Sequence, residues 1–419
     1  MGKIATPTRV NRTITVDFQN EATYFHLLGN GKAFVECVLA FVLSLGFQLT
    51  HKTTCRGGGC LTRHSHYARV RLGGLTMWRM QCTTCKAVFT ILLHFVLRSR
   101  SMHPDLARDA LLATHGGLSL ELCAVLSHLS PMALYRLVCA FGRPSLVTVL
   151  TRCKLSLPVY FLADEKHSRC LTEKVYLPTI VRGRVIWHLG YSASKSAAAF
   201  TESYGVYQRA ALLQEPTYQV RGALTDGFDS TTHSMKTLFP GARLGNCLRH
   251  ALNKLPDKLV GLVAPVRQGL RSKFHTLLHR CRQRKSLRVV ALGQRLRRFA
   301  DHIATTVSPD HGERVRSWFQ TKKAGWYTVL ADPQMPAMST VLDQAHNAID
   351  RKLFMMKGFH HPGGSQPAFL TGLAHLYNLI PYQRRALHAG QCGLEVEGGR
   401  LPTHDWMLNL QILTSGGFR

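Results

Sequence analysis

Residues 158–164 read PVYFLAD and residues 222–226 read GALTD, and each run ends on an aspartate, Asp164 in the first and Asp226 in the second. Short apolar runs rich in aromatic and β-branched residues are typical of buried strands. An acid at the end of such a strand lies at the rim of its sheet, where a substrate can reach it. We therefore predict that Asp164 and Asp226 lie on neighbouring strands and share a divalent cation, which prefers oxygen ligands.

The chain around these two runs changes character several times. Residues 174–181 and 184–192 are further strand-like runs, and a helix is expected from about 195 to 213. Strands that alternate with helices predict an α/β domain. Residues 251–335 differ, because they are helical in pattern and contain 17 Lys and Arg against five Asp and Glu. The α/β character resumes after Pro336 with a long helix near residues 340–357.

We expect seven segments along the chain. They are an N-terminal segment with an apolar helix (1–50), a zinc ribbon (51–100), a helix-turn-helix DNA-binding domain (101–150), the first part of an α/β core (151–250), a basic helical insertion (251–335), the last helices of the core (336–385) and a C-terminal tail (386–419).

The charge balance points to a polyanionic partner. The 419 residues include 53 Lys and Arg against 23 Asp and Glu, a formal net charge of +30. Such a field attracts nucleic acid, and an acidic lipid surface is the alternative. The first residues are polar and the apolar stretch at 34–47 is too short to span a bilayer. We therefore expect a cytoplasmic, nucleoid-associated protein that binds double-stranded DNA and no membrane.

Four cysteines have the spacing of a zinc site. Four residues separate Cys55 from Cys60, two separate Cys82 from Cys85, and 21 lie between the two pairs. Zn²⁺ takes four soft ligands in a tetrahedron, and two short turns can each contribute two. We predict a structural Zn²⁺ with these four ligands, and the alternatives are unrelated buried cysteines or substitution by a nearby histidine. Histidines 64 and 66 are the substitutes, and arginines 69, 71 and 79 are expected to contact DNA phosphates.

Residues 104–142 have the outline of a helix-turn-helix. Ser119 and Ser130 are each placed to begin a helix, and Pro131 occupies the first position of the second one. The second helix of such a motif enters the major groove. We therefore expect Met132, Tyr135 and Arg136 to be exposed readers of DNA, and a plain three-helix linker is the alternative.

The sequence that follows Asp226 resembles a known family. Residues 226–255 read DGFDSTTHSMKTLFPGARLGNCLRHALNKL, with Phe-Pro-Gly-Ala at 239–242 and a Cys-x-x-His pair at Cys247 and His250. This order resembles the Mutator-like superfamily of DDE transposases and its bacterial insertion-sequence relatives. The resemblance covers roughly residues 155–385. It implies an RNase H-like α/β core interrupted by an all-helical insertion, with Cys247 and His250 beside the active site.

The same resemblance implies a third acid on a late helix. Residues 339–359 read STVLDQAHNAIDRKLFMMKGF, and aligning Phe359 with the family's phenylalanine places Asp343 on its glutamate. This sequence departs from the family twice, since the acid is Asp and Thr340 stands where Asn is expected. Asp350 is the rival, and Glu165 is a lesser one because strand alternation would point it away from Asp164.

We therefore expect a DNA transposase whose catalytic acids Asp164, Asp226 and Asp343 bind two Mg²⁺ or Mn²⁺ ions. It would cleave the terminal inverted repeats of an element and join them to target DNA, acting as a homodimer or a larger assembly. Two alternatives remain open at this stage: an inactive, transposase-derived DNA-binding protein, and a structure-specific nuclease.

Overall fold

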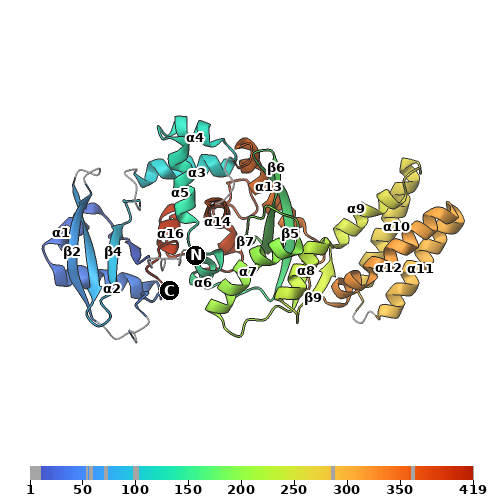
Figure 1. The fold of residues 1–419 in the computed structure, drawn as a ribbon, viewed down its shortest axis with the longest axis horizontal. Helices are drawn as coiled ribbons and strands as arrows, with labels where there is room; N and C mark the ends of the chain where they lie inside the picture. Colours follow the sequence, from blue (N-terminus) through green and yellow to red (C-terminus); the bar gives the residue numbers. More distant parts are fainter. Residues whose placement is uncertain are drawn as a thin grey trace, which may run out of the picture. The chain divides into compact units, whose positions relative to one another are not determined.

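A computed structural model describes residues 11–52, 55, 60–69, 74–97, 103–284, 288–359 and 364–418 (Figure 1). The chain forms two compact units. The first contains Met1–Leu155, Phe354–Met356 and Gly363–Arg419, and the second contains Ser156–Leu353 and Lys357–Pro362. Both contain helices and mixed sheets, so the expected mixed α/β class is confirmed.

The first unit begins with a four-stranded sheet of order β1-β4-β3-β2. Strand β1 pairs with β4 in parallel, and the other neighbours are antiparallel. Helix α2 is the apolar stretch recognised in the sequence, and its Phe34 stacks on Phe18 in the core beside Tyr24. These elements are β1 (Thr13–Val16), α1 (Glu21–Leu28), α2 (Gly31–Ser44), β2 (Leu61–Arg69), β3 (Leu75–Cys82) and β4 (Val88–Leu93).

A helical part completes the first unit. The side chains of Ser119 and Ser130 accept hydrogen bonds at the starts of α4 and α5, as their sequence positions indicate. Helix α5 packs on α14 so closely that a Cβ on Gly142 would come within 1.7 Å of the Ala368 carbonyl oxygen. The helices are α3 (Pro104–Gly116), α4 (Leu120–Leu126), α5 (Pro131–Phe141), α6 (Leu146–Arg152), α14 (Gln366–Leu379), α15 (Gly393–Val396) and α16 (Trp406–Leu413).

The C-terminal residues are part of this unit and not a separate tail. Arg152 donates to the carbonyl oxygens of Leu413 and Ser415, and the Ser415 hydroxyl accepts from the Thr15 backbone. The structure therefore divides the expected segment 336–385 differently, because α14 belongs to the first unit. No single helix among the described residues is long and apolar enough to cross a membrane, although α4 and α5 together, bent by 106°, reach that length and composition.

The second unit is built on a five-stranded sheet of order β7-β6-β5-β8-β9. Strands β5, β6 and β7 are antiparallel neighbours, whereas β8 and β9 run parallel to β5. Ser196 caps α7, which packs with α8 on the sheet. The elements are β5 (Tyr160–Cys170), β6 (Glu173–Arg182), β7 (Val185–Leu189), α7 (Ala197–Gln214), β8 (Gly222–Thr225), α8 (Asp229–Leu238) and β9 (Arg243–Asn246).

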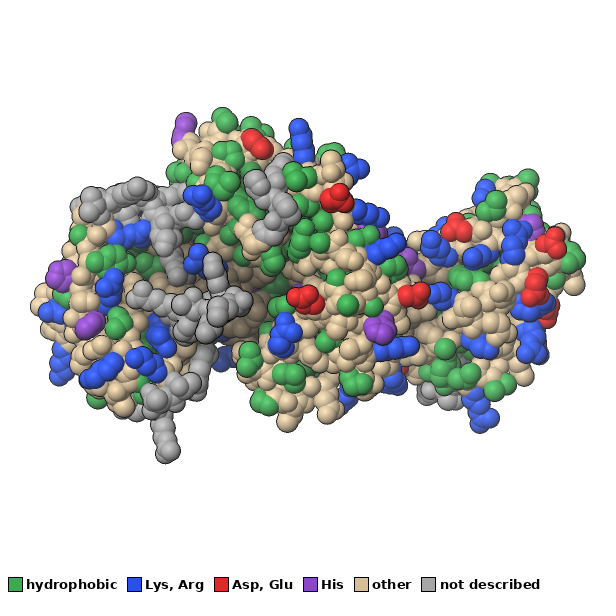
Figure 2. Space-filling view, in the orientation of Figure 1, with side chains coloured by type: hydrophobic (Ala, Val, Ile, Leu, Met, Phe, Trp, Pro, Cys, Tyr) green, Lys and Arg blue, Asp and Glu red, His purple; other side chains and the backbone are tan. Residues whose placement is uncertain are grey.

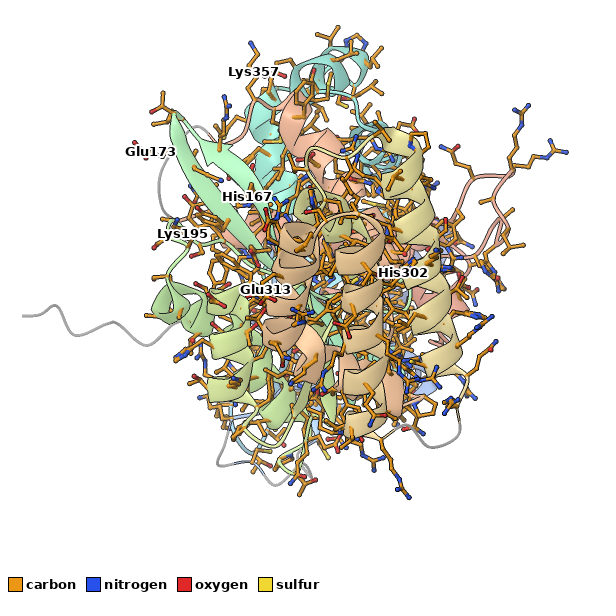
Figure 3. The ribbon with its side chains drawn as sticks, turned by 90° about the vertical axis from the view of Figure 1, so that its right-hand side faces the viewer. His167, Glu173, Lys195, His302, Glu313 and Lys357 are labelled. Carbon is orange, nitrogen blue, oxygen red and sulfur yellow. The ribbon has the colours of Figure 1, made fainter. Side chains whose placement is uncertain are left out.

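The basic segment of the second unit consists, in its described part, of helices joined by short turns. Trp326 is buried, and with Phe274, Phe319 and Trp318 it forms the core of a bundle of α10, α11 and α12. Figure 3 shows two of these helices side by side, with His302 on α11 and Glu313 on α12. The helices are α9 (Leu248–Lys258), α10 (Ala264–Arg282), α11 (Val289–Thr306), α12 (Pro309–Ala331) and α13 (Thr340–Met355).

Candidate active site and metal centre

Strand register brings the first two predicted acids together. In the parallel pair of β5 and β8, Leu162 lies beside Leu224. Two residues further along each chain are Asp164 and Asp226, which therefore lie at the same level on neighbouring segments. Burial, and then the charges of Asp226 and Glu165, raise the pKa of Asp164 well above its usual value. A cation placed between these carboxylates would remove the repulsion.

Glu165 has different surroundings from Asp164. Its carboxylate accepts a hydrogen bond of 2.6 Å from the Thr231 hydroxyl of α8. Burial raises its pKa to about 7, with a smaller contribution from the charge of Asp226. The Asp164 carboxylate instead acts electrostatically on His250 of α9. Consecutive strand residues thus point to different helices, as side-chain alternation requires.

Cys247 and His250 lie at the start of α9, close to the acids. The Cys247 sulfur contacts Ser339 just before α13, 3.4 Å from its hydroxyl oxygen and 3.3 Å from its backbone nitrogen. Cys247 foremost, and the charges of Asp164 and Asp226 in addition, raise the pKa of His250 to about 9. His250 is therefore an imidazolium at neutral pH. Its Nδ1 is buried and has no hydrogen-bond partner among the described residues.

Asp343, the expected third acid, lies in the first turn of α13. Its carboxylate is 3.7 Å from the guanidinium of Arg249, which also donates to the Thr340 hydroxyl at 3.2 Å. Arg249 immediately precedes His250 in α9. The ion pair therefore holds the start of α13 against the helix that carries the Cys-x-x-His pair.

Two contacts fix the register of α13 along β5. Asp350 is paired with Lys166 at 3.2 Å, and Phe359 forms a parallel bridge with Cys170, so the helix and the strand run in the same direction. Asp343 precedes Asp350 by two helical turns, about 10 Å at 1.5 Å per residue. That length equals about three strand residues, which brings Asp343 back to the level of Asp164. Asp350, the rival acid, lies beside Lys166, further along β5. Because β5 continues to Cys170, Asp164 lies within the strand and not at its end, as the sequence had led us to expect.

The three acids do not form a tight cluster. Among the described residues, the one group of at least three His, Cys, Asp or Glu ligand atoms within 4.8 Å of one another is at a different place, in the first unit. Asp164 and Asp226 are neighbours by register, and Asp343 is placed by its helix. The carboxylate oxygens of the three acids therefore do not all lie within 4.8 Å of one another.

The tight group consists of His51, Cys55, Cys82 and Cys85. The sulfurs of Cys55 and Cys82 are 3.9 Å apart, and Cys85 sulfur is 3.5 Å from His51 Nδ1. Three thiols and one imidazole fit the tetrahedral donor set of a structural Zn²⁺ site. Burial opposes ionisation of Cys85, but hydrogen bonds from the backbone of Lys52 and from His51 outweigh it and lower its pKa to about 6.

Cys60, expected as a ligand from its spacing, lies outside this group. Its side chain is exposed, although its carbonyl oxygen accepts from the Thr83 backbone at 2.9 Å. The structure thus places His51 where the sequence led us to expect Cys60. Histidines 64 and 66 are exposed on β2, and His66 packs on Trp78. Glycines 57–59 lie outside the described residues.

The expected DNA-contacting side chains differ in availability. Met132 and Arg136 are exposed on α5, whereas the Tyr135 ring stacks on Phe369 with centroids 4.6 Å apart and its hydroxyl hydrogen-bonds Ser365. Arg69 donates to the Leu97 carbonyl oxygen. The guanidinium of Arg79 lies over the Tyr67 ring. Arg71 lies outside the described residues.

Two residues near the acids were not singled out in the sequence. His346 of α13 lies one turn beyond Asp343, is buried, and has no hydrogen-bond partner for Nε2 within the described part of the chain. Burial lowers its pKa to about 3. Lys322 of α12 reaches the carbonyl oxygen of Gly227, next to Asp226. A basic residue in a basic helix has no distinguishing signal in the sequence.

No family model and no curated protein matches this sequence.

Proposed function

We propose that this protein is a DNA transposase with a two-metal active site. The observation that carries the proposal is the placement of Asp164 and Asp226 at the same level on adjacent parallel segments, with α13 in register to add Asp343. The resemblance implies an RNase H-like core with an all-helical insertion. The mixed five-stranded sheet, and the position of helices α10 to α12 in the chain between β9 and α13, support that fold.

The residues present fit the metal ions that the proposal requires. Carboxylate oxygens are the ligands that Mg²⁺ prefers, and burial together with the charges of Asp226 and Glu165 raises the pKa of Asp164, an effect that a bound cation would oppose. Asp164, Asp226 and Asp343 would hold the ions. When bound, two Mg²⁺ activate the attacking oxygen and neutralise charge on the leaving oxygen of a phosphodiester.

The chain's own groups would position the DNA. Cys247 and the charges of Asp164 and Asp226 favour the protonated form of His250, and its positive charge beside the acids would help to attract a phosphate. In the first step a water oxygen bonds to phosphorus and the bond to the 3′ oxygen breaks, which leaves a 3′-hydroxyl and a 5′-phosphate. In the second step that 3′ oxygen bonds to a target phosphorus and displaces the target's 3′ oxygen. Neither step requires a covalent protein–DNA bond.

The front of the chain would bind the element's ends. The His51, Cys55, Cys82 and Cys85 group would hold a structural Zn²⁺ that fixes the β3–β4 turn. Helix α5, with Met132 and Arg136 exposed, is the DNA reader in this proposal. The net charge of +30 favours a complex with polyanionic DNA and disfavours positively charged partners. We propose a homodimer or larger assembly on DNA, because an element has two ends to join.

The test is a cleavage and strand-transfer assay. The substrate is a linear duplex that contains the DNA sequences found on either side of the coding region. The reaction buffer contains Mg²⁺ or Mn²⁺. We expect the parent to cut and join, and Asp164→Ala and Asp226→Ala to lose both steps while still binding DNA. Cutting without joining would favour a structure-specific nuclease. A parent that binds this DNA and never cuts it would make the protein an inactive, transposase-derived DNA-binding protein.

A further inference from the structure

Helix α12 of the basic segment is anchored at the edge of the sheet that carries the acids. A Cβ on Gly325 would come within 2.6 Å of the side chain of Asn246, the last residue of β9 and the one before Cys247. One turn later, Val329 packs so closely on Gly245 that a Cβ there would come within 2.4 Å. Two glycines thus let the helix and the strand approach each other closely, and the position of α12 at this edge is fixed by packing.

Lys322 is one turn before Gly325 and reaches the loop after β8. Its Nζ is 3.4 Å from the carbonyl oxygen of Gly227, the residue that follows Asp226. A Cβ on Gly227 would come within 3.0 Å of the same Nζ. Gly227 also has a φ of +92°, a backbone conformation that favours glycine. The sequence Asp226-Gly227 therefore leaves space for an ammonium group beside the acid.

The ammonium of Lys322 has no carboxylate partner there. No Asp or Glu oxygen lies within 4.0 Å of Nζ in the described parts of the chain, although Asp226 is adjacent to the residue it contacts. A half-buried lysine bound to one carbonyl oxygen keeps two N–H donors for another acceptor. Lysine is a compact point charge that binds phosphate oxygens well.

We propose that Lys322 binds a non-bridging oxygen of the phosphate to be cleaved. This inference rests on the proposed function and deepens it, because it makes the helical segment between β9 and α13 part of the active site. Asp164 and Asp226 would hold the metal ions on one side of the phosphate, and the ammonium of Lys322 would contact one of its non-bridging oxygens. A positive group at that oxygen stabilises the charge that develops in the transition state.

The first experiment compares Lys322→Ala with Lys323→Ala, in which the neighbouring lysine hydrogen-bonds Gln320 on its own helix. Single-turnover cleavage is measured at saturating flanking-sequence duplex with Mn²⁺, and duplex affinity is measured separately. We expect Lys322→Ala to cleave about 10²-fold more slowly, the scale of losing one oxyanion donor, with affinity changed less than about threefold. Lys323→Ala should cleave like the parent. Equal rates for Lys322→Ala and the parent would overturn the proposal.

A second measurement separates a phosphate contact from a loss of structure. Each non-bridging oxygen of the scissile phosphate is replaced in turn by sulfur. If Lys322 contacts one of them, that substitution slows Lys322→Ala less than it slows the parent. Equal sulfur effects in both proteins would overturn the contact even if Lys322→Ala is slow or misfolded. A parent that never cleaves overturns the proposed function and this inference together, whereas a cleaving parent with an unaffected Lys322→Ala overturns this inference alone.

Discussion

Two consecutive acids, Asp164 and Glu165, differ in what surrounds them and so in what they can do. Asp164 lies level with Asp226 and acts on the imidazolium of His250. Glu165 is satisfied by a 2.6 Å hydrogen bond from Thr231. Both acids have a raised pKa, so what separates them is position: Asp164 lies beside Asp226, whereas the Glu165 carboxylate is engaged by the Thr231 hydroxyl. In the proposed site this arrangement favours Asp164 over Glu165 as the metal ligand.

Glu165 predicts a pH dependence of stability. Its pKa rises from 4.5 to about 7 on folding, so the folded state binds the proton more tightly. The stability from this group is complete below pH 4.5 and is lost as the pH rises through about 7. Glu165→Gln keeps an acceptor for Thr231 but does not titrate. Between pH 4.5 and 8 the free energy of unfolding should fall in both proteins, and we expect the fall to be about 1–3 kcal/mol smaller in Glu165→Gln than in the parent.

The measurement is urea unfolding at several pH values in magnesium-free buffer. Glu173→Gln is the control, because Glu173 is exposed at the start of β6, and it should follow the parent. Parallel pH curves for the parent and Glu165→Gln would contradict the prediction.

The zinc site can be tested by replacing its proposed ligands one at a time. We expect the purified parent to hold one Zn²⁺ per chain, and Cys82→Ser and His51→Ala to lose it, because each removes one of four donors that lie within 4.8 Å of one another. Cys60→Ser should keep the metal, since its exposed side chain lies outside the group. The readout is elemental analysis of zinc per chain. Retention by His51→Ala with loss in Cys60→Ser would restore the four-cysteine set expected from spacing.

At the scale of elements, the position of α13 decides which acid completes the site. The Asp350–Lys166 ion pair and the bridge between Phe359 and Cys170 set its register on β5. Asp343 then lies at the level of Asp164, where Arg249 contacts it. Asp350 is engaged by Lys166 and lies about two helical turns away.

We therefore expect Asp343→Ala to cleave at least about 10²-fold more slowly than the parent. Asp350→Ala should cleave within about tenfold of the parent. It loses only a half-exposed ion pair, worth about 0–1 kcal/mol. Single-turnover cleavage and thermal melting are measured for both variants, which are matched because they remove the same carboxylate from the same helix. A dead Asp350→Ala beside an active Asp343→Ala would mean that the rival acid completes the site.

The sequence was sufficient for elements whose signal is local. The apolar runs predicted the existence of β5 and β8, and serine caps predicted the starts of α4 and α5. The expected strand end at Asp164 was wrong, because β5 continues in its pairing with β6 to Cys170. Contacts between distant segments could not be predicted in this way. The close approach of α5 to α14 depends on Gly142 and Gly372, and the sequence of neither helix indicates that the other is its packing partner. His51 has the same limitation, because a lone histidine four residues before a cysteine resembles any other histidine.

At the scale of the whole molecule, the basic charge is unevenly distributed along the chain. Residues 251–335 contain 17 Lys and Arg against five acids, whereas residues 103–142 contain two against three. In the latter segment Arg108 is already paired with Asp105 and Asp405. Figure 2 shows Lys and Arg side chains on helices α10 to α12 as well as elsewhere on the visible face. Helices α10 to α12 should therefore contribute more of the electrostatic affinity for DNA than the helix-turn-helix segment does.

Together with the proposal that the protein binds DNA, this distribution predicts how salt should weaken the complex. Arg297 and Arg298 are exposed on α11. Each phosphate that a cation neutralises releases counterions, and the slope of log K against log salt changes by about 0.9 per contact. Replacing both arginines with alanine should reduce that slope by about 1 to 2 on a duplex of fixed length.

The matched control replaces Arg169 and Lys174 with alanine. These residues face each other near the end of the β5–β6 hairpin, several residues along the strand from Asp164, and both are exposed. The control removes the same charge from the same unit, so a general effect of net charge would change both slopes equally. A larger change in the control than in the α11 variant would mean that DNA lies along the hairpin. That result would also count against the phosphate contact of Lys322, because α12 packs on β9, on the other side of β5 from β6.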